Sequence, residues 1–413
     1  MQMKSLDLSA IREDRPAAIV VGLGQNGLAS VRSLARAGLP VIAVDQDLMK
    51  FTARSRLCQK IELRSGKGSP ELIEKLLELG PRLPSKAVLF PSGDAPLQRL
   101  SEHRGELQPF YRFSFPSREL VALTLDKKRF YEFAKANNIA IPQFFCPTDG
   151  GDCARVAREV QYPALIKPYQ PNLGWRQRFP GKKLFRAEDA NALLALYEKL
   201  APTHDDLIVQ EIIPGPDSNL AFSLTYFDSG SQPLGMFTGR KLRQYPPHFG
   251  TASMAESRFD ATVADLTTGI LRALSYTGYG SVEFKWDPRQ AIYKAIEVTA
   301  RTWFPHGIST ACGLNLLHIA YCNIIGEKGP DDQGFEEGVK WIHEDRDLRA
   351  CLHLMRHGEL SLGDWVASYR GKRTFALAAR DDIGPFLFFL AHLAGIPWRL
   401  LRRRLSLGHR DQS

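Results

Sequence analysis

The stretch from Thr277 to Trp303, TGYGSVEFKWDPRQAIYKAIEVTARTW, alternates apolar and polar residues in the manner of a β-hairpin. Between residues 282 and 286 every second side chain is Val, Phe or Trp, which is the pattern of a strand with one buried face. Asp-Pro-Arg-Gln at 287–290 is typical of a turn, and a second arm follows it. The segment therefore predicts a pair of antiparallel strands.

This hairpin brings four polar side chains together. Glu297, Thr299 and Arg301 share one face of the second arm, because side chains two residues apart lie on the same side of a strand. Folding back places Glu283 of the first arm near Glu297. Carboxylate and hydroxyl oxygens suit Mg²⁺, which favours carboxylates together with phosphate oxygens. The hairpin thus predicts a metal site, and the alternative is a solvated strand face with a salt bridge.

The composition fits a globular protein with anionic partners. With 413 residues, two or three domains are expected, and 44% hydrophobic residues supply sizeable cores. A net charge of +9 suits nucleotides, phosphorylated substrates or an anionic membrane surface. The 6 cysteines are scattered without a CxxC pair or a zinc spacing, which favours a reduced, cytoplasmic setting. The first residues have no apolar core, so we expect no signal peptide.

A strand, a glycine turn and a helix open the chain. The strand ends at Gly22, the turn brings Gly24 and Gly27, and a second strand ends at Asp45. Glycines for a tight turn, a helix start for phosphate and an acid about 20 residues later for ribose form the dinucleotide fingerprint. The alternative is a turn that only packs a helix on a sheet. Residues 92–94 follow another strand, so all these residues are predicted at the C-terminal ends of parallel strands.

Lysines follow in places that suit phosphate groups. Lys127 and Lys128 are predicted in the first turn of a helix, where cations are unfavourable unless anions lie nearby. Lys167 comes at the end of an apolar strand, ALIKP. The basic, glycine-containing loop over 170–182, with Lys183 beyond it, is predicted to be a mobile flap over phosphates. The alternatives are surface lysines and a basic surface loop.

The strand in IVQEIIPG, at 208–215, ends in a turn that can hold an adenine. Its last residues are Gln210, Glu211, Ile212 and Ile213. Such a strand end can offer backbone N–H and C=O groups to a base, and Asp217 can then reach a ribose hydroxyl.

Taken in order, these segments resemble the ATP-grasp superfamily. Within it, the chain is similar to the predicted carboxylate–amine ligases of the D-aspartate ligase and carbamoyl-phosphate-synthase-like type. The matching segments are LDK at 125–127, ALIKP at 164–168, IVQEIIPG at 208–215, GRKLRQYPPHFGTAS at 239–253, GSVEFKWD at 280–287 and IEVTAR at 296–301. Each is weak alone, but their order and spacing are specific, and they cover most of the chain.

The resemblance implies an α/β fold in which an open parallel sheet precedes an ATP-grasp part of α+β type. Residues 1–115 would form the Rossmann-like pre-ATP-grasp domain. Residues 116–330 would form the ATP-grasp domain, with two subdomains that meet near 190–205. Residues 331–413 would be a C-terminal appendage.

The resemblance also implies ATP and two Mg²⁺ ions as cofactors. The implied nucleotide contacts are Lys127, Lys167, Lys183, Gln210, Glu211, Ile212, Ile213 and Asp217. The implied metal ligands are Glu283, Glu297 and Thr299, and the implied catalytic residues are Arg301 and Lys241. The family pattern at the second metal position is Glu-x-Asn-x-Arg, and here Thr299 replaces the asparagine. Either the second metal site is looser, or the enzyme is degenerate.

The resulting hypothesis is an ATP-dependent ligase that activates a carboxylate as an acyl phosphate and joins it to an amine. Phosphoryl transfer needs positioning and charge neutralisation, and no GxSxG or Cys/His signature of a covalent nucleophile is present. Two alternatives stay open: an NAD(P)-dependent oxidoreductase that uses GLGQNG, and a non-catalytic nucleotide-binding scaffold. We expect small-molecule or precursor-linked substrates and no nucleic-acid partner, and a homodimer is compatible with the sequence.

The C-terminal region combines a nearly unbroken apolar run from residue 384 with arginines at 399–404. The run is too short to span a bilayer. An apolar face, Trp398 and the arginines suit an interfacial helix over 384–407 on anionic lipid. This predicts a cytoplasmic protein at the inner face of the membrane. The alternative is a helix packed on the body with a basic tail.

Overall fold

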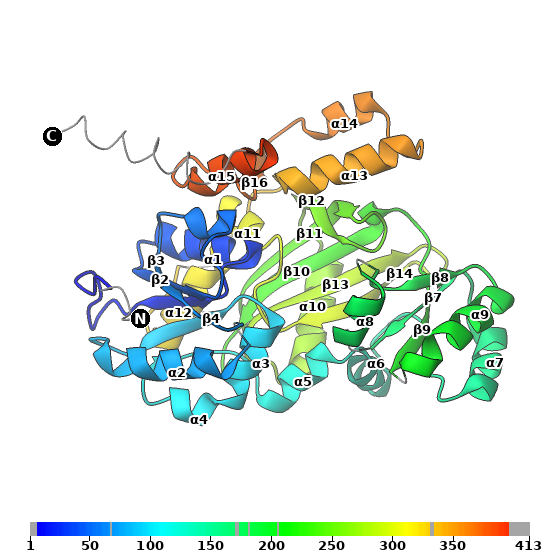
Figure 1. Ribbon diagram of the computed structural model, residues 1–413, viewed down its shortest axis with the longest axis horizontal. Helices are drawn as coiled ribbons and strands as arrows, with labels where there is room; N and C mark the ends of the chain where they lie inside the picture. Colours follow the sequence, from blue (N-terminus) through cyan, green and yellow to red (C-terminus); the bar gives the residue numbers. More distant parts are fainter. Residues whose placement is uncertain are drawn as a thin grey trace. The chain divides into compact units, whose positions relative to one another are not determined.

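The computed structural model describes residues 6–66, 68–169, 173–180, 182–204, 206–330 and 334–395 (Figure 1). Two compact units make up the chain, and both are discontinuous in sequence. The first unit comprises Met1–Phe115, Leu242–Ser257 and Arg301–Ser413, and the second comprises Pro116–Lys241 and Arg258–Ala300. The linear domain boundaries expected from the sequence stay predictions.

A parallel sheet of five strands forms the centre of the first unit, in the order β3-β2-β1-β4-β5. The strands are β1 (Ala18–Val21), β2 (Val41–Asp45), β3 (Gln59–Glu62), β4 (Ala87–Pro91) and β5 (Tyr111–Arg112). The connecting helices are α1 (Gln25–Arg36), α2 (Pro70–Leu79), α3 (Asp94–Glu102) and α4 (Arg104–Leu107), with short 3₁₀ turns η1 (Phe51–Arg54) and η2 (Gly80–Arg82). Every residue of β1, β2 and β4 is buried, as in a sheet covered on both faces. The predicted parallel sheet is confirmed.

Later segments complete this unit. The helices α11 (Gly307–Ala311) and α12 (Leu316–Ile325) pack against α1. Three further strands are neighbours in the order β12 (Thr251–Ser257), β15 (Lys340–Ile342) and β16 (Arg373–Phe375). The C-terminal helices are α13 (Glu344–Arg356), α14 (Leu362–Ser368) and α15 (Gly384–Leu393). A buried ion pair between Arg32 of α1 and Asp382, at 2.9 Å, holds the C-terminal segment on the unit.

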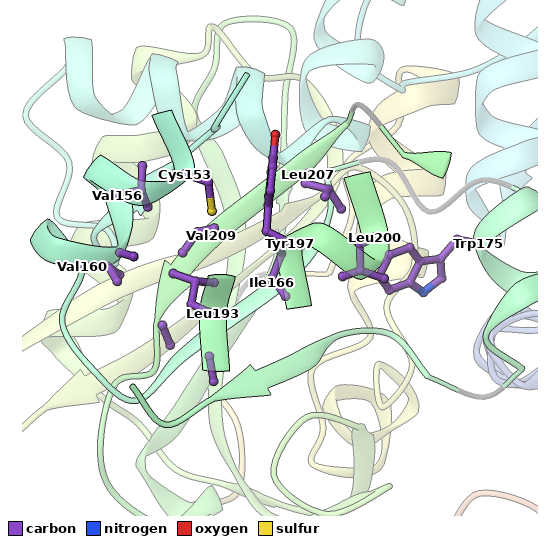
Figure 2. Packing of buried hydrophobic residues seen from close by; sticks show 13 residues of the cluster. Cys153, Val156, Val160, Ile166, Trp175, Leu193, Tyr197, Leu200, Leu207 and Val209 are labelled. Atoms are coloured by element: carbon purple, nitrogen blue, oxygen red, sulfur yellow. The ribbon is translucent and has the colours of Figure 1, made fainter. Parts of the chain in front are cut away.

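The second unit contains a four-stranded sheet with the order β6-β9-β7-β8. Its strands are β6 (Phe144–Phe145), β7 (Ala164–Pro168), β8 (Phe185–Ala187) and β9 (Leu207–Glu211). The helices of this part are α5 (Arg118–Leu125), α6 (Lys127–Ala136), α7 (Gly150–Glu159), α8 (Leu173–Arg178) and α9 (Ala190–Leu200), with the 3₁₀ turn η3 (Ala201–Thr203). Figure 2 shows the core in which side chains of α7 and α9 pack against β7 and β9.

Long antiparallel strands form the rest of the second unit, in the order β14-β13-β10-β11. They are β10 (Leu220–Phe227), β11 (Pro233–Tyr245), β13 (Gly278–Asp287) and β14 (Ile292–Thr299). The helix α10 (Ala261–Ala273) packs on β10, and the 3₁₀ turn η4 (Asp217–Asn219) directly precedes β10. β11 passes into the first unit after Lys241. The hairpin predicted from the alternating sequence is β13–β14, so that prediction is confirmed.

Candidate active site

The β13–β14 hairpin sets the two candidate metal carboxylates opposite each other. Its register pairs Glu283 with Glu297 and Ser281 with Thr299, and directly opposite residues share a face. Burial of Val282 and Phe284 on the other face fixes this register, because a slip of one residue would expose them. The Glu297 side chain is exposed and Glu283 is partly exposed. Two carboxylates, of which one is exposed, therefore lie side by side.

Lys241 of β11 reaches this pair from two strands away. Glu283, Phe222 of β10 and Gly239 of β11 form one row across the sheet, and Lys241 lies two residues further along the same face. Its Nζ is 2.6 Å from Glu283 Oε2, and the residue is 2% exposed. A buried ammonium beside a candidate metal ligand adds positive charge where phosphate and carboxylate oxygens would gather.

Lys167 of β7 lies close to the same charges. Its Nζ donates a hydrogen bond to Gln210 Oε1 of β9 over 2.9 Å. Burial and the positive charge of Lys127 lower the pKa of Lys167 to about 7, against the opposing charge of Glu297. Lys127 is the first residue of α6, which Asp126 caps by accepting from the Arg129 amide. The predicted phosphate lysines thus lie near each other and near the hairpin.

Tyr131 is a member of this cluster that sequence reasoning missed. It lies one turn after Lys127 on α6, fully buried, and looks in the sequence like any core aromatic. Its hydroxyl lies 3.2 Å from Gln210 Oε1 and 3.1 Å from the Ile296 carbonyl, next to Glu297. Burial, with the charges of Glu297 and Glu283, raises its pKa. The Tyr131 hydroxyl therefore connects α6 both to Gln210, which accepts from Lys167, and to the β13–β14 hairpin.

At the end of β9, where an adenine is predicted to bind, several polar groups already make hydrogen bonds within the protein. The Glu211 carboxylate is buried and accepts hydrogen bonds from Lys294 at 2.8 Å and Arg289 at 2.6 Å. Burial would raise the pKa of Glu211, but these bonds hold it below its ordinary value. The amides of Glu211 and Ile212 donate to the carbonyls of Gln143 and Pro163. Any base contact here must therefore use other backbone groups, with Ile213 as the remaining predicted residue.

Asp217 and Lys183 are the last two residues predicted to contact the nucleotide. Asp217 begins η4 and is half-buried. The loop before it is fixed because Lys285 Nζ donates to the carbonyls of Gly215 and Pro216, each over 2.9 Å. Lys183 is exposed and follows residue 181, which lies outside the described part of the chain. The ribose and flap roles of these two residues stay predictions.

In the first unit, the glycine turn forms as the fingerprint predicts. The acid of the fingerprint, Asp45, is already engaged by other groups of the protein. Gly22 has a φ of +100°, and a Cβ on Gly27 would lie 1.8 Å from the Gly22 carbonyl oxygen. Asp45 is buried, accepts from the Leu23 amide and pairs with Lys50 at 2.7 Å. A carboxylate used in this way is not available to a ribose, so the contacts do not favour the oxidoreductase alternative.

Arg301 belongs to the first unit and forms a two-pronged pair with Asp94, which starts α3 just after β4. Nε lies 2.6 Å from Oδ1 and Nη2 lies 3.2 Å from Oδ2. The amide of Asn26 donates to the carbonyls of Ser92 and Thr302, which flank this pair in the sequence. The structure therefore brings Arg301 to the strand ends of the parallel sheet.

The oxygen donors of the hairpin are of the kind that holds Mg²⁺. In the described ranges, no group of three or more His, Cys, Asp or Glu side chains forms a complete protein cage. Mg²⁺ commonly uses one or two carboxylates with substrate phosphates and waters, so Glu283 and Glu297 with the Thr299 hydroxyl fit it. The nearby lysines supply the charges that such phosphates need.

Comparisons with known proteins concern the chain as a whole. No family model matches the chain. The D-aspartate ligase of Enterococcus faecium (strain Aus0004) is 24% identical over 324 residues, which are 75% of this chain and 76% of that protein. The N5-carboxyaminoimidazole synthetase of Staphylococcus aureus superposes with a TM-score of 0.61 at 14% identity, over 79% of this chain and 81% of that one. The chain is therefore similar in sequence to a D-aspartate ligase, and its fold is that of ATP-grasp proteins.

A second solved structure with this fold contains a nucleotide. It is the biotin carboxylase domain dimer of the Hydrogenobacter thermophilus 2-oxoglutarate carboxylase, in complex with MgADP, ADP and bicarbonate. Its TM-score is 0.60 at 14% identity, over 78% of this chain and 73% of that one. At such identities the superposition shows the fold, and the predicted α/β fold with an ATP-grasp part is confirmed.

The segment predicted as a flap, residues 170–182, is helical in its described centre. Residues 170–172 and 181 lie outside the described part, and between them runs α8. Trp175 of α8 is 2% exposed, and its indole N–H donates to the Lys182 carbonyl over 2.7 Å. Figure 2 shows the indole at one edge of the hydrophobic core. A loop throughout 170–182 is therefore wrong, and its closure over phosphates stays a prediction.

The apolar C-terminal run forms α15, which packs by one face. Phe389 lies in a small core cluster with Leu28 and Leu377, and its ring contacts Phe51 at a centroid distance of 5.7 Å. Residues 396–413, with the arginine cluster, lie outside the described part of the chain. Among the described residues, no helix has the length and apolar character needed to cross a membrane.

Proposed function

We propose that this ATP-grasp protein uses Mg-ATP to activate a carboxylate as an acyl phosphate and then joins it to an amine. The observation that carries the proposal is the pairing of Glu283 with Glu297 in the hairpin register, with Lys241 and the Lys167–Gln210 pair beside it. Oxygen ligands and ammonium groups gathered in this way suit the triphosphate of a nucleotide.

In the proposed mechanism, the side chains of the second unit neutralise and position charge. Lys127 and Lys167 hold phosphate oxygens, and Glu283 and Glu297, with Thr299, hold two Mg²⁺ ions. These ions, when bound, draw charge from the transferring phosphoryl group. Ile213 contacts the adenine through its backbone, and Asp217 contacts the ribose.

The chemistry then proceeds in two balanced steps. A carboxylate oxygen attacks the γ-phosphorus, the bond to the β-phosphate oxygen breaks, and ADP leaves. The amine attacks the acyl carbon, the bond to the phosphate oxygen breaks, and the nitrogen loses a proton as the amide forms. Arg301 and Lys241 stabilise the negative charge that develops on oxygen in both steps.

Ligand-induced thermal stabilisation tests this proposal on the whole chain. A ligand that binds only the native state raises the unfolding midpoint by mass action. We expect stabilisation by Mg-ATP and not by NAD or NADP, and its loss in Glu297→Gln. Stabilisation by NAD alone would overturn the proposal. Mg-ATP binding without ADP release, across all acid and amine pairs tried, would instead favour the non-catalytic scaffold.

The C-terminal region suggests a peripheral membrane contact. Ile383, just before α15, and Leu387 and Leu390 of α15 are exposed and follow one stripe, opposite the face that packs on the unit. We propose that this stripe, with the basic sequence after it, rests on anionic lipid. Removing residues 397–413 leaves the packed helix intact and should abolish sedimentation with phosphatidylglycerol vesicles. Unchanged sedimentation would reject the contact.

A homodimer is the assembly that we propose. The biotin carboxylase domain compared above is a dimer. In this chain, Leu348 and Leu352 of α13 and Leu362 and Val366 of α14 are large, exposed apolar side chains that a second copy can cover. Light scattering should give twice the monomer mass, and a monomer at all concentrations would contradict the proposal.

A further inference from the structure

Arg346 of the first unit carries a charge that no carboxylate of the protein balances directly. It lies in the first turn of α13 and is half-buried. Among the residues that the structure describes, no acidic side chain forms an ion pair with its guanidinium. An arginine removed from water is normally paired, because its charge loses hydration. A half-buried guanidinium without an acid is therefore a candidate binding group for an anion.

The three acids in the first turn of α13 are all engaged by other groups. Glu344 accepts hydrogen bonds from two backbone amides shortly after β16. Asp345 forms an ion pair with Arg349 at 2.8 Å. The buried Asp347 forms an ion pair with Arg243 at 2.9 Å. An acid of this turn could reach the free guanidinium only by giving up one of these contacts, so the balancing charge has to come from elsewhere.

The ring of Phe304 holds this guanidinium in a defined position. Arg346 Cζ lies 4.9 Å from the centroid of the Phe304 ring, which is a cation–π contact. The same ring is fixed by Trp341, edge to face at a centroid distance of 5.3 Å, and by His343, stacked at 5.4 Å. A guanidinium that lies on an aromatic ring still presents the N–H groups at its edge to two oxygens of a carboxylate or phosphate.

His343 places a second donor without a protein partner beside this ring. It is fully buried, and its Nδ1 accepts from the Arg346 amide over 3.3 Å as the N-cap of α13. Burial lowers the pKa of His343 to about 3, so the ring is neutral and its proton is on Nε2. Within the described ranges, this buried N–H donates to no protein atom. A buried donor of this kind needs an acceptor from outside the protein.

The sequence sets this pair of donors close to a residue of the proposed reaction. Phe304 follows Arg301 by three residues, and three residues span at most about 11 Å. We propose that Arg346, positioned by Phe304, binds an acidic group of a substrate, a carboxylate or phosphate that the reaction leaves unchanged. One of the substrates then carries an anionic group in addition to the group that reacts. That the anion belongs to a substrate rests on the proposed ligase function, whereas its binding to Arg346 does not.

Calorimetry on the full chain without nucleotide tests the anion site. The probes are succinate, glutarate, inorganic phosphate and pyrophosphate. We expect at least one probe to bind, and Arg346→Gln to weaken it ten-fold or more. A larger loss for the dicarboxylates would identify a carboxylate site, and a larger loss for the two phosphates would identify a phosphate site. Arg346→Lys keeps the charge but not the two-pronged donor edge, so it should weaken the same probe at least three-fold, and it serves as the test should Arg346→Gln not fold.

Arg356→Gln is the matched control, because Arg356 is the last residue of α13 and is exposed. It removes the same charge from the same helix, so an effect of overall charge would appear in both variants. We expect it to change every affinity by less than two-fold. Equal losses in Arg346→Gln and Arg356→Gln, or no binding of any probe by the wild-type chain, would overturn the inference. The titrations contain no ATP, so their failure is distinct from failure of the proposed function, which shows itself as a lack of stabilisation by Mg-ATP.

Discussion

The glycine turn of the first unit and the β13–β14 hairpin of the second both carry acids that suit a nucleotide, but they use them differently. Asp45 is 1% exposed, and its carboxylate accepts a hydrogen bond from the Leu23 amide and forms an ion pair with Lys50. Glu297 is exposed, and its opposite neighbour Glu283 contacts Lys241. The difference teaches that a motif predicts chemistry only where the fold leaves its polar atoms open to a ligand.

Replacing Glu297 by Gln should have the largest effect on function. Loss of one carboxylate weakens the hold on Mg²⁺, so we expect turnover to fall by at least about 100-fold. The free energy of unfolding without ligand should change by less than about 0.5 kcal/mol, because the side chain is exposed. ADP release and denaturant unfolding measure the two quantities. Retained turnover would remove Glu297 from the metal site.

Asp45→Asn should show the reverse profile. The buried carboxylate accepts a backbone hydrogen bond and an ion pair, so its loss should lower the free energy of unfolding by about 2 kcal/mol. Mg-ATP affinity should not change. Burial would raise the pKa of Asp45, but Lys50 and two amides hold it below 3.8, so this stability is present above pH 3.8 and lost as the pH falls further. A weaker Mg-ATP affinity at full stability would contradict the comparison.

Lys167 gives the hairpin region a pH dependence that the glycine turn lacks. Its pKa of about 7 means that the group loses its charge as the pH rises through 7. Mg-ATP affinity should therefore decrease above pH 7, and binding at pH 8 should take up a proton, because the phosphates restore the charge. Calorimetry at several pH values, in buffers of different ionisation enthalpy, measures both effects.

Lys167→Ala is the variant that checks this assignment. It should weaken Mg-ATP by about ten-fold at pH 6, where the lysine is charged, and by less at pH 8.5. Without ligand, the wild-type protein should gain stability as the pH rises from 7 toward 10.5, because the unfolded chain then binds more protons. This gain should be absent in Lys167→Ala. An unchanged pH profile would place another group at the phosphates.

The local patterns could be predicted from the sequence, and the long-range partners could not. The hairpin and its carboxylate pair follow from the alternation of apolar residues, which fixes both the strands and their register. Nothing in the sequence indicates that Asp94 pairs with Arg301, 207 positions away, or that Trp175 anchors the expected loop. The sequence alone predicts that Asp45 contacts a ribose. Its hydrogen bond from the Leu23 amide exists only in the folded chain, so the sequence could not show that this carboxylate is already engaged.

Tyr131 extends the comparison to a residue that touches no substrate in the proposed mechanism. Its hydroxyl fixes Gln210, which holds Lys167, and lies beside the carbonyl that precedes Glu297. Tyr131→Phe should weaken Mg-ATP by about three-fold to five-fold and shift the pH at which affinity falls, since Lys167 is then less well held. The measurement is the same calorimetric pH series.

Tyr276→Phe is the matched control for Tyr131→Phe. Tyr276 is also fully buried in the second unit, and its hydroxyl donates to the Tyr279 carbonyl over 2.8 Å. Both variants remove one buried hydroxyl donor, so both should lose about 1 kcal/mol of unfolding free energy. Only Tyr131→Phe should alter the pH profile of Mg-ATP binding. If both variants gave the same pH profile of Mg-ATP binding, Tyr131 would have only a structural role.

Thr299→Asn should have the smallest effect, and its sign decides between the two interpretations of this position. Thr299 is 7% exposed and lies opposite Ser281, so the larger asparagine must fit a nearly closed space. If the threonine oxygen ligates Mg²⁺, the amide oxygen replaces it, and the Mg²⁺ concentration for half-maximal ADP release should stay within about three-fold or decrease. A large loss of activity with unchanged stability would mean that the threonine hydroxyl donates a hydrogen bond that an amide oxygen cannot replace. The hairpin would then hold its metal through Glu283 and Glu297 alone.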